Sequence, residues 1–192
     1  MPVDNPVSSR FLEMRHGKTL SLLDGKAPKS ILDAGCGSGE FLERFSERFP
    51  SAKIYGCDIL RDDVECAKKA CPRGKFYCGD FLGLDFGPVE LVAMLEVLEH
   101  SDDVELMLKK AASLVGKGGY VLISIPRPEV LHWRAIWWAW SRTFGRKWYG
   151  QHGKMSEAEL DALASRCGLV KEKRERFFLD SISITLYRVD FA

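Results

Sequence analysis

The stretch LDAGCGSGE at residues 32–40 decides how this chain folds. A short apolar run leads into glycines at positions 35, 37 and 39, and a segment with helical spacing follows. Glycines there permit a tight turn and let the backbone approach a ligand that a Cβ would hold off. The first turn of the following helix offers free N–H groups to an anionic group. The stretch therefore predicts a strand, a ligand-binding turn and a helix.

Two other interpretations of this glycine loop remain open. A dinucleotide-binding loop has the pattern Gly-x-Gly-x-x-Gly, but the third glycine here comes one residue early. Glu40 at the next position would repel a pyrophosphate. The second alternative is a turn with a purely structural role.

The same alternation of strand and helix extends from the loop in both directions. The predicted strands are 30–34, 52–57, 75–78, 89–95 and 120–125, and the predicted helices are 9–24, 40–49, 61–70, 101–115 and 156–167. Two strand-like stretches, 170–178 and 182–190, follow with no room for a helix between them. These patterns predict an α/β fold, in which a doubly wound, mostly parallel seven-stranded sheet ends in an antiparallel hairpin.

Polar residues mark the beginnings of two of these helices. Ser156, with Glu159 three residues later, predicts a capping box. Ser101 or Asp102 is the expected N-cap of the helix at 101–115. In the leading helix, His16 is expected to lie at the surface.

Length and composition bound the class of protein. The chain has 192 residues, of which 46% are apolar and 29% charged, and its net charge is +1. This balance favours one folded domain over 1–192, with a leading helix in 1–29 and an insert at 127–152. It excludes disordered and fibrous classes, and near-neutrality makes nucleic acid an unfavoured partner.

The cysteines and the apolar runs indicate a compartment. Six cysteines, at 36, 57, 66, 71, 78 and 167, have no zinc-site spacing, so no metal is expected. They are predicted to be small buried residues in a reducing environment. The sequence has no signal-peptide pattern and no apolar run of the ~18 residues that a membrane span needs. We therefore expect a cytoplasmic protein.

Acidic residues follow the ends of consecutive predicted strands. Asp58 ends the second strand, where a carboxylate can accept both hydroxyls of a ribose, and Asp80 ends the third. Each acid alone is also consistent with a helix cap or a loop position. Together with the glycine loop they occupy the carboxyl edge of the sheet, where open α/β sheets bind ligands.

These motifs carry a family resemblance. LDAGCGSGEF, YGCDI, CGDF and MLEVLEH closely resemble motifs of the class I S-adenosylmethionine-dependent methyltransferases, and the LEVLEH stretch looks most like the small-molecule enzymes of ubiquinone and menaquinone biosynthesis. The resemblance is strong over residues 30–125. It implies a Rossmann-like methyltransferase fold and S-adenosyl-L-methionine as the cofactor.

The resemblance also implies roles for individual residues. The methionine part of the cofactor would lie against Asp33 and the loop residues Gly35, Cys36, Gly37 and Gly39. The ribose and adenine would be held by Asp58, Ile59, Asp80 and Phe81. Leu95 and Glu96 would lie beside the methionine part and the acceptor.

A hydroxyl acceptor would make a general base useful. The candidates are His100, His132 and His152, followed by Glu96 and Glu99. His100 comes just after the fourth strand, where a purely structural role is the alternative. His152 lies between the aromatic segment and the helix at 156–167. We expect His152→Ala to lower turnover without abolishing cofactor binding.

All five tryptophans fall between residues 133 and 148, in a locally basic segment. On a helix, Trp133, Trp137 and Trp140 would share one face, and they are the candidate substrate residues. A lid on the core, the roof of an acceptor pocket, and docking at an anionic membrane surface are the open interpretations. Base stacking on RNA is a weaker one.

The function expected from the sequence is methyl transfer from S-adenosylmethionine to a small acceptor, with lipophilic or aromatic molecules suiting the tryptophans. One alternative is an RNA or protein methyltransferase, but the chain reads Leu95-Glu96-Val97-Leu98 where an Asn-Pro-Pro-Tyr-like tetrad would hold an amide or base amine. A cofactor-binding module without turnover is another alternative. A dehydrogenase is the least favoured. The oligomeric state is left open.

Overall fold

A computed structural model describes residues 6–127, 130 and 155–190. The helices are α1 (Pro6–Ser21), α2 (Glu40–Arg48), α3 (Arg61–Ala70), the short 3-10 helix η1 (Leu98–His100), α4 (Val104–Val115) and α6 (Glu157–Arg166). The strands are β1 (Ser30–Ala34), β2 (Lys53–Asp58), β3 (Lys75–Cys78), β4 (Leu91–Leu95), β5 (Tyr120–Pro126), β6 (Leu169–Phe177) and β7 (Ile182–Val189).

The strands form one seven-stranded sheet in the order β3-β2-β1-β4-β5-β7-β6. Strands β3, β2, β1, β4 and β5 run parallel, whereas β7 lies antiparallel to β5 and to β6. The predicted doubly wound sheet with its C-terminal hairpin is therefore confirmed. The strand order reverses between β1 and β4, and such a switch point is where open α/β sheets bind ligands.

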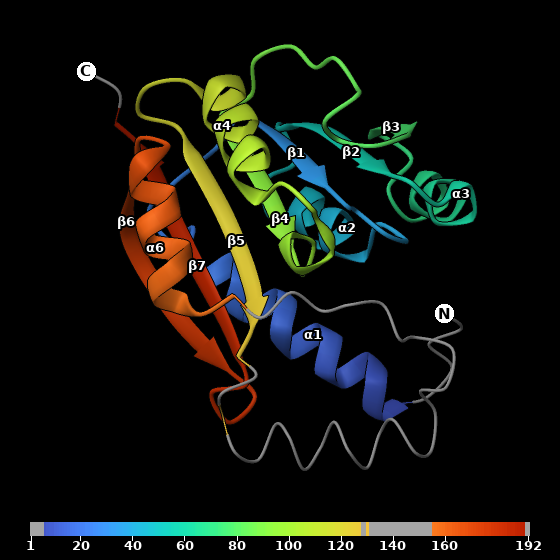
Figure 1. The fold of residues 1–192 in the computed structure, drawn as a ribbon. Coiled ribbons are helices and arrows are strands. Elements are labelled where there is room, and N and C mark those ends of the chain that lie inside the picture. Colours follow the sequence, from blue (N-terminus) through green and yellow to red (C-terminus); the bar gives the residue numbers. More distant parts are fainter. Residues whose placement is uncertain (1–5, 128–129, 131–154, 191–192) are drawn as a thin grey trace.

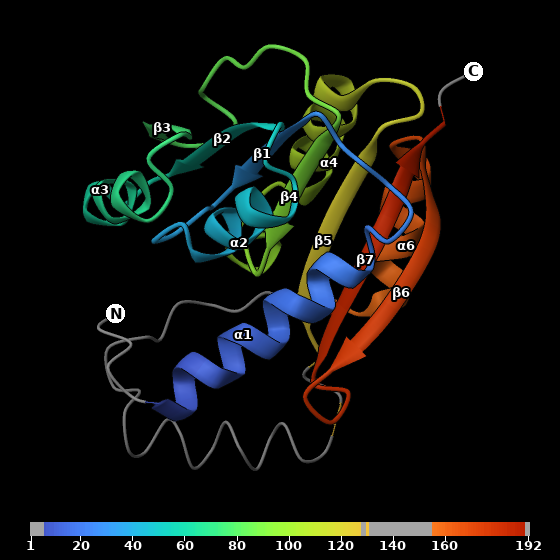
Figure 2. The same cartoon turned by 180° about the vertical axis from the view of Figure 1, so that it is seen from behind.

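Helices cover both faces of the sheet (Figures 1 and 2). Apolar residues of α1, α2 and α3 pack with one face, and those of α4 and α6 pack with the other. Alternate residues of β4 serve the two cores: Val92 and Met94 face α4, while Leu91 and Ala93 face the opposite side. This period of two within a continuous apolar run is what a strand covered on both sides requires.

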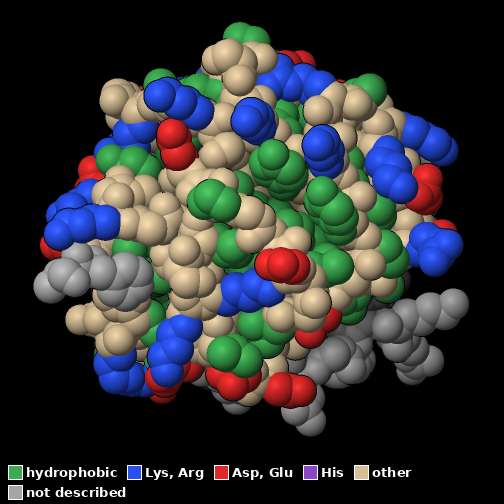
Figure 3. Space-filling model, turned by 90° about the horizontal axis from the view of Figure 1, so that it is seen from above, with side chains coloured by type: hydrophobic (Ala, Val, Ile, Leu, Met, Phe, Trp, Pro, Cys, Tyr) green, Lys and Arg blue, Asp and Glu red, His purple; other side chains and the backbone are tan. Residues whose placement is uncertain are grey.

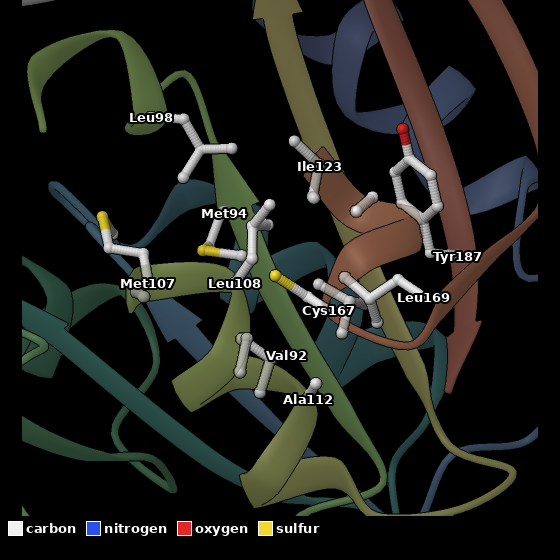
Figure 4. Packing of buried hydrophobic residues seen from close by; sticks show 14 of the residues in the cluster. Val92, Met94, Leu98, Met107, Leu108, Ala112, Ile123, Cys167, Leu169 and Tyr187 are labelled. Carbon is white, nitrogen blue, oxygen red and sulfur yellow. The ribbon is translucent and has the colours of Figure 1, made fainter. Parts of the chain in front are cut away.

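The core beneath α4 and α6 is closed by large side chains from several elements (Figure 4). Leu108 of α4, Ile123 of β5 and Tyr187 of β7 are each almost completely buried. Together these residues fix α4 and α6 against β4 and β5. The beginnings of both helices are thereby placed at the carboxyl edge of the parallel strands.

Several local predictions were wrong. The N-cap of α4 is Asp103 rather than Ser101 or Asp102, because its side chain accepts a hydrogen bond from the Leu106 N–H at 2.9 Å. Cys66 and Cys78 are exposed, not buried, since they lie on the outer side of α3 and on the edge strand β3. The capping box of Ser156 and Glu159 is confirmed.

Two surface properties bear on partners. Among the described residues, no helix is long and apolar enough to cross a membrane. Figure 3 looks onto the edge that carries the N-terminal ends of the parallel strands, and Lys and Arg side chains are spread over it with acidic ones between them.

A half-buried polar cluster ties α6 to the hairpin. Asp161 of α6 accepts two hydrogen bonds from the Arg174 guanidinium, at 2.6 and 3.1 Å. The same carboxylate accepts one from the Tyr187 hydroxyl at 2.7 Å. Arg174 also donates to Thr185 at 2.8 Å, so its charge is satisfied within the fold.

We expect Asp161→Ala to lower the free energy of unfolding by about 2 kcal/mol, because it strands the Arg174 guanidinium and the Tyr187 hydroxyl. Lys171→Ala is the matched control, since Lys171 reaches the same carboxylate at 2.7 Å from an exposed position. It should cost less than about 1 kcal/mol. Urea denaturation of both variants checks this; equal losses would contradict it.

Candidate functional site

The glycine loop turns the chain from β1 into α2 at the switch point. Gly35 and Cys36 both donate their N–H groups to the Cys57 carbonyl at the end of β2, at 2.8 and 3.0 Å. The three loop glycines at 35, 37 and 39 have φ angles of 78°, 49° and 85°. This left-handed backbone is the reason why glycine is favoured there.

The three glycines differ in what a side chain would meet. A Cβ on Gly35 would overlap the Val97 side chain, and one on Gly39 would lie 2.7 Å from the Ala67 Cα in α3. A Cβ on Gly37 would have no heavy atom within 4 Å. Gly35 and Gly39 are therefore needed for packing, whereas Gly37 borders open space.

Asp58 joins the end of β2 to the loop. Its Oδ2 accepts a hydrogen bond from the Gly37 N–H at 2.9 Å, and its Oδ1 accepts one from the Leu60 N–H at 2.9 Å. The neighbouring Ile59 is 71% exposed, so an apolar side chain projects beside this carboxylate. Asp80, after β3, is exposed and accepts from the Leu82 N–H at 3.0 Å.

Three other predicted cofactor residues lie deeper. Cys36 is buried, and burial raises the pKa of its thiol well above the usual range, so it stays uncharged. Leu95 packs on the core beside α1 and α2. Phe81 is also buried and stacks on Phe86, so its predicted contact with an adenine ring stays a prediction.

Asp33 is a buried carboxyl at the end of β1. It is 2% exposed, and its Oδ1 has no hydrogen-bond partner among the described residues. Burial, with the charge of Asp58 adding to it, raises the pKa of Asp33 to about 7, although the Arg15 charge opposes the shift. An unpartnered buried carboxyl of this kind is expected where a ligand supplies the missing partner.

Arg15 of α1 reaches the end of β4. Its Nη1 donates to Glu96 Oε2 at 3.0 Å, while Glu96 Oε1 is buried and no described residue pairs with it. Glu96 has a φ of 58°, which is uncommon for a residue other than glycine and marks a constrained turn after β4. The sequence patterns missed Arg15, because a single arginine in a charged helix gives no motif.

Glu99 and His100 follow in η1 and differ in exposure. Glu99 is 7% exposed, and its Oε2 has no hydrogen-bond partner in the described part of the chain. Burial raises the pKa of Glu99 to about 8, with the nearby Glu96 adding to the shift and Arg15 opposing it. His100 is exposed. The raised pKa of Glu99 is of the kind that is typical of functional groups.

The expected surface position of His16 was wrong. The imidazole is 2% exposed and lies edge-on to the Phe41 ring, with the ring centroids 5.7 Å apart. Its Nε2 is 3.4 Å from Arg15 Nη2. Burial and the charges of Arg15 and Arg44 lower the pKa of His16 to about 3, so the ring stays neutral beside the guanidinium.

The acids at this edge do not form an evident metal site. Among the described residues, no group of three or more His, Cys, Asp or Glu side chains lies in a suitable arrangement. His132, His152, Trp133, Trp137 and Trp140 fall outside the described residues, as does most of the insert at 127–152.

The sequence matches the family profile described as "Methyltransferase domain" over residues 8–173. The chain belongs to the class I S-adenosylmethionine-dependent methyltransferases. This match covers the glycine loop, Asp58, Asp80 and the stretch after β4, which confirms the family resemblance.

A ubiquinone biosynthesis O-methyltransferase of Idiomarina loihiensis is 30% identical to this methyltransferase over 136 residues, which are 67% of this chain and 52% of that protein. The chain thus spans about half the length of the curated relatives it matches.

Solved structures confirm the fold. The N-methyltransferase NodS of Bradyrhizobium japonicum, in complex with S-adenosyl-L-homocysteine, has a TM-score of 0.73 at 18% identity and covers 97% of this chain and 89% of its own. Magnesium protoporphyrin IX methyltransferase of Synechocystis, with the same molecule bound, has a TM-score of 0.72 at 21% identity and covers 96% and 87%.

The residues of this methyltransferase fit the cofactor of its family. Gly37 leaves room at the loop where a Cβ would intrude, and Asp33 offers an unpartnered buried carboxyl. Gly39, at the N-cap of α2, has no side chain to occupy the first N–H groups of that helix. The exposed Ile59 provides an apolar surface beside Asp58.

The contrast between two glycines is testable. Gly37→Ala should remain folded, with a loss of about 1 kcal/mol for its left-handed backbone, and should bind S-adenosylmethionine at least tenfold more weakly. Gly39→Ala should lose several kcal/mol of stability, because its Cβ would press on the α3 backbone. Thermal melts and calorimetry measure both effects. Equal destabilisation of the two variants would contradict the assignment of Gly39 to packing and of Gly37 to the ligand side of the loop.

The buried Asp33 makes stability depend on pH. Its pKa is about 7 in the folded protein and about 4 in an unfolded chain, so the stability from this group is highest below pH 4 and falls as pH rises to 7. Asp33→Asn should therefore be more stable than the wild type at pH 8 by about 2 kcal/mol, with no such gain at pH 4.

If Asp33 holds the methionine part of the cofactor, as the family resemblance implies, the same variant should bind S-adenosylmethionine at least tenfold more weakly at pH 8, because it lacks the carboxylate. Denaturation at the two pH values and calorimetry at pH 8 measure these changes. A variant that is less stable at pH 8 and binds normally would overturn both expectations.

Proposed function

We propose that this methyltransferase transfers a methyl group from S-adenosylmethionine to a hydroxyl of a small, largely apolar acceptor. The observation that supports it best is the set of unpartnered buried carboxyl oxygens of Asp33, Glu96 and Glu99 at one sheet edge. Unpartnered buried groups are costly, and they are retained where a ligand or a reaction uses them.

The proposed roles divide the edge between cofactor and acceptor. Asp33 and the loop backbone hold the methionine part, Asp58 accepts from the ribose, and Ile59 lies against the adenine. Asp80 and Phe81 complete the adenine side. When bound, S-adenosylmethionine supplies a methyl group whose bonding pair stays with sulfur as the acceptor oxygen is methylated.

The hydroxyl proton of the acceptor must pass to a base of this chain. Glu96 is the weaker choice, because its Oε2 already accepts a hydrogen bond from Arg15 Nη1 at 3.0 Å. Glu99 has no such ion pair among the described residues, and its pKa is about 8. His100 and His152 remain the histidine candidates.

The names of relatives and the tryptophans of the insert bear on the nature of the acceptor. Relatives are named for ubiquinone biosynthesis, and a structural neighbour is named for magnesium protoporphyrin IX, both of which are ring systems. We propose that Trp133, Trp137 and Trp140 in the insert at 127–152 cover a ring of this kind. Residues 1–192 would then form one domain, and peripheral contact of the insert with a membrane is the alternative role of its tryptophans. The proposal places the enzyme in the cytoplasm and without a nucleic-acid partner.

Turnover decides between an enzyme and a binding module. Titration calorimetry should show micromolar binding of S-adenosylmethionine and no preference for NAD. Incubation with 4-alkylphenols and 4-alkylcatechols should release S-adenosylhomocysteine, and Asp58→Asn should weaken binding of the methyl donor. Tight binding without product from any hydroxylated acceptor, or from RNA and protein fractions, would favour the module.

The pH profile separates the proton acceptors. Glu99 must be ionised to act as a base, so kcat/KM should rise with pH through about 8. Glu96 and Arg15 face Glu99 from the turn after β4 and from α1, and Glu159 and Arg166 face it from α6. Glu99→Gln should lower kcat about 100-fold and abolish this rise of kcat/KM with pH. A rise centred near 6.5 that survives in Glu99→Gln would assign the base to a histidine.

A further inference from the structure

A cleft opens between η1, α4 and α6. Its volume is about 430 Å³, and most of its wall is apolar. The apolar lining comes from all three elements and from the residue that precedes α6: Leu98, Val104, Met155, Ala162 and Leu163. A cleft of this size and composition is typical of sites for small apolar molecules.

The cleft has one polar group that the protein leaves unsatisfied. Glu99 lines it, and its Oε2 is buried without a hydrogen-bond partner. The other charged residues of the lining are occupied: Glu159 accepts from Ser156 in the capping box, and Arg166 lies 3.4 Å from Glu105. Of the three charged residues that line the cleft, Glu99 is therefore the one with a buried carboxyl oxygen that has no hydrogen-bond partner among the described residues.

The position of the cleft connects it to the methyl-transfer site. Its Leu98 and Glu99 lie in η1, which begins three residues after the end of β4, and the charges of Arg15 and Glu96 act on Glu99. A second cleft of similar volume, about 440 Å³, lies at the opposite edge, where it is lined by Lys26, Glu90 and Tyr120. No unpartnered buried side chain among the described residues lines that second cleft.

We propose that the cleft between η1, α4 and α6 is the acceptor subsite, which binds the apolar part of a neutral hydroxylated molecule while Glu99 contacts the reacting hydroxyl. This inference rests on the proposed function and names the substrate class for the same site. The charged residues of the lining are Glu99, Glu159 and Arg166, so the described wall has no excess of positive charge that would favour an acceptor with a carboxylate or phosphate.

The length of the alkyl chain on a phenol tests whether the cleft binds the apolar part of the acceptor. We would titrate 4-methylphenol, 4-butylphenol and 4-hexylphenol calorimetrically into the full chain saturated with S-adenosylhomocysteine. Each added methylene buried in the cleft should improve affinity by up to about fourfold. The gain should stop when the cleft is full.

Two exposed positions on α6 give a matched pair of variants. Ala162→Phe fills the cleft and should remove the gain from chain length. Ser165→Phe adds the same ring to α6 at an exposed position outside the lining of the cleft. Its gain in affinity with chain length should match that of the wild type. Val104→Ala enlarges the cleft and should shift the best chain length upward. All three should bind S-adenosylhomocysteine within about twofold of the wild type.

The outcomes separate this inference from the proposed function. Loss of the chain-length gain in Ala162→Phe alone supports the subsite. No binding of 4-hexylphenol by the wild type, no dependence on chain length, or equal behaviour of Ala162→Phe and Ser165→Phe overturns it. Failure of the wild-type chain to bind S-adenosylhomocysteine would instead overturn the proposed function.

Discussion

Arg15 of α1 donates to Glu96 at 3.0 Å, and its positive charge also opposes the upward pKa shifts of Asp33 and Glu99. The strands bring carboxyl groups to one edge because each parallel strand ends there. Burial and mutual repulsion raise the pKa of two of them. One guanidinium, held beside the neutral His16, offsets part of this cost. The leading helix is thus a part of the site and not an appendage to the sheet.

The edge is arranged at the expense of stability. Glu96 has an uncommon left-handed backbone, and Asp33 and Glu99 are buried with unpartnered oxygens. Elsewhere in the described chain, a comparable carboxylate is well satisfied: Asp161 accepts from Arg174 and Tyr187. The contrast shows that the fold is able to pair a half-buried acid when only packing is at stake. Unpaired acids at the switch point are consistent with selection for ligand binding over stability.

The sequence predicted the parts that depend on local periodicity. Alternating strands and helices, the glycine loop and the capping box of Ser156 all follow from spacing within a few residues. The errors came from contacts between distant segments. His16 is buried because α1 docks beside Phe41, and Cys78 is exposed because β3 is an edge strand. Neither fact is present in the local pattern, and the pairing of Arg15 with Glu96 joins residues 81 positions apart.

Two clefts of nearly equal volume lie at opposite edges of the sheet, so volume alone does not identify a binding site. Their polar groups distinguish them. Lys26, in the cleft at the N-terminal edge, already contacts Glu172 at 2.6 Å and Tyr120 at 3.4 Å. Glu99, in the cleft at the carboxyl edge, has a buried oxygen with no partner among the residues that the structure describes. A ligand gains most where it supplies a hydrogen bond that the folded chain lacks, because the protein has already met the cost of burying that group. Unmet hydrogen bonding therefore favours the cleft beside Glu99 as the one in which the acceptor binds.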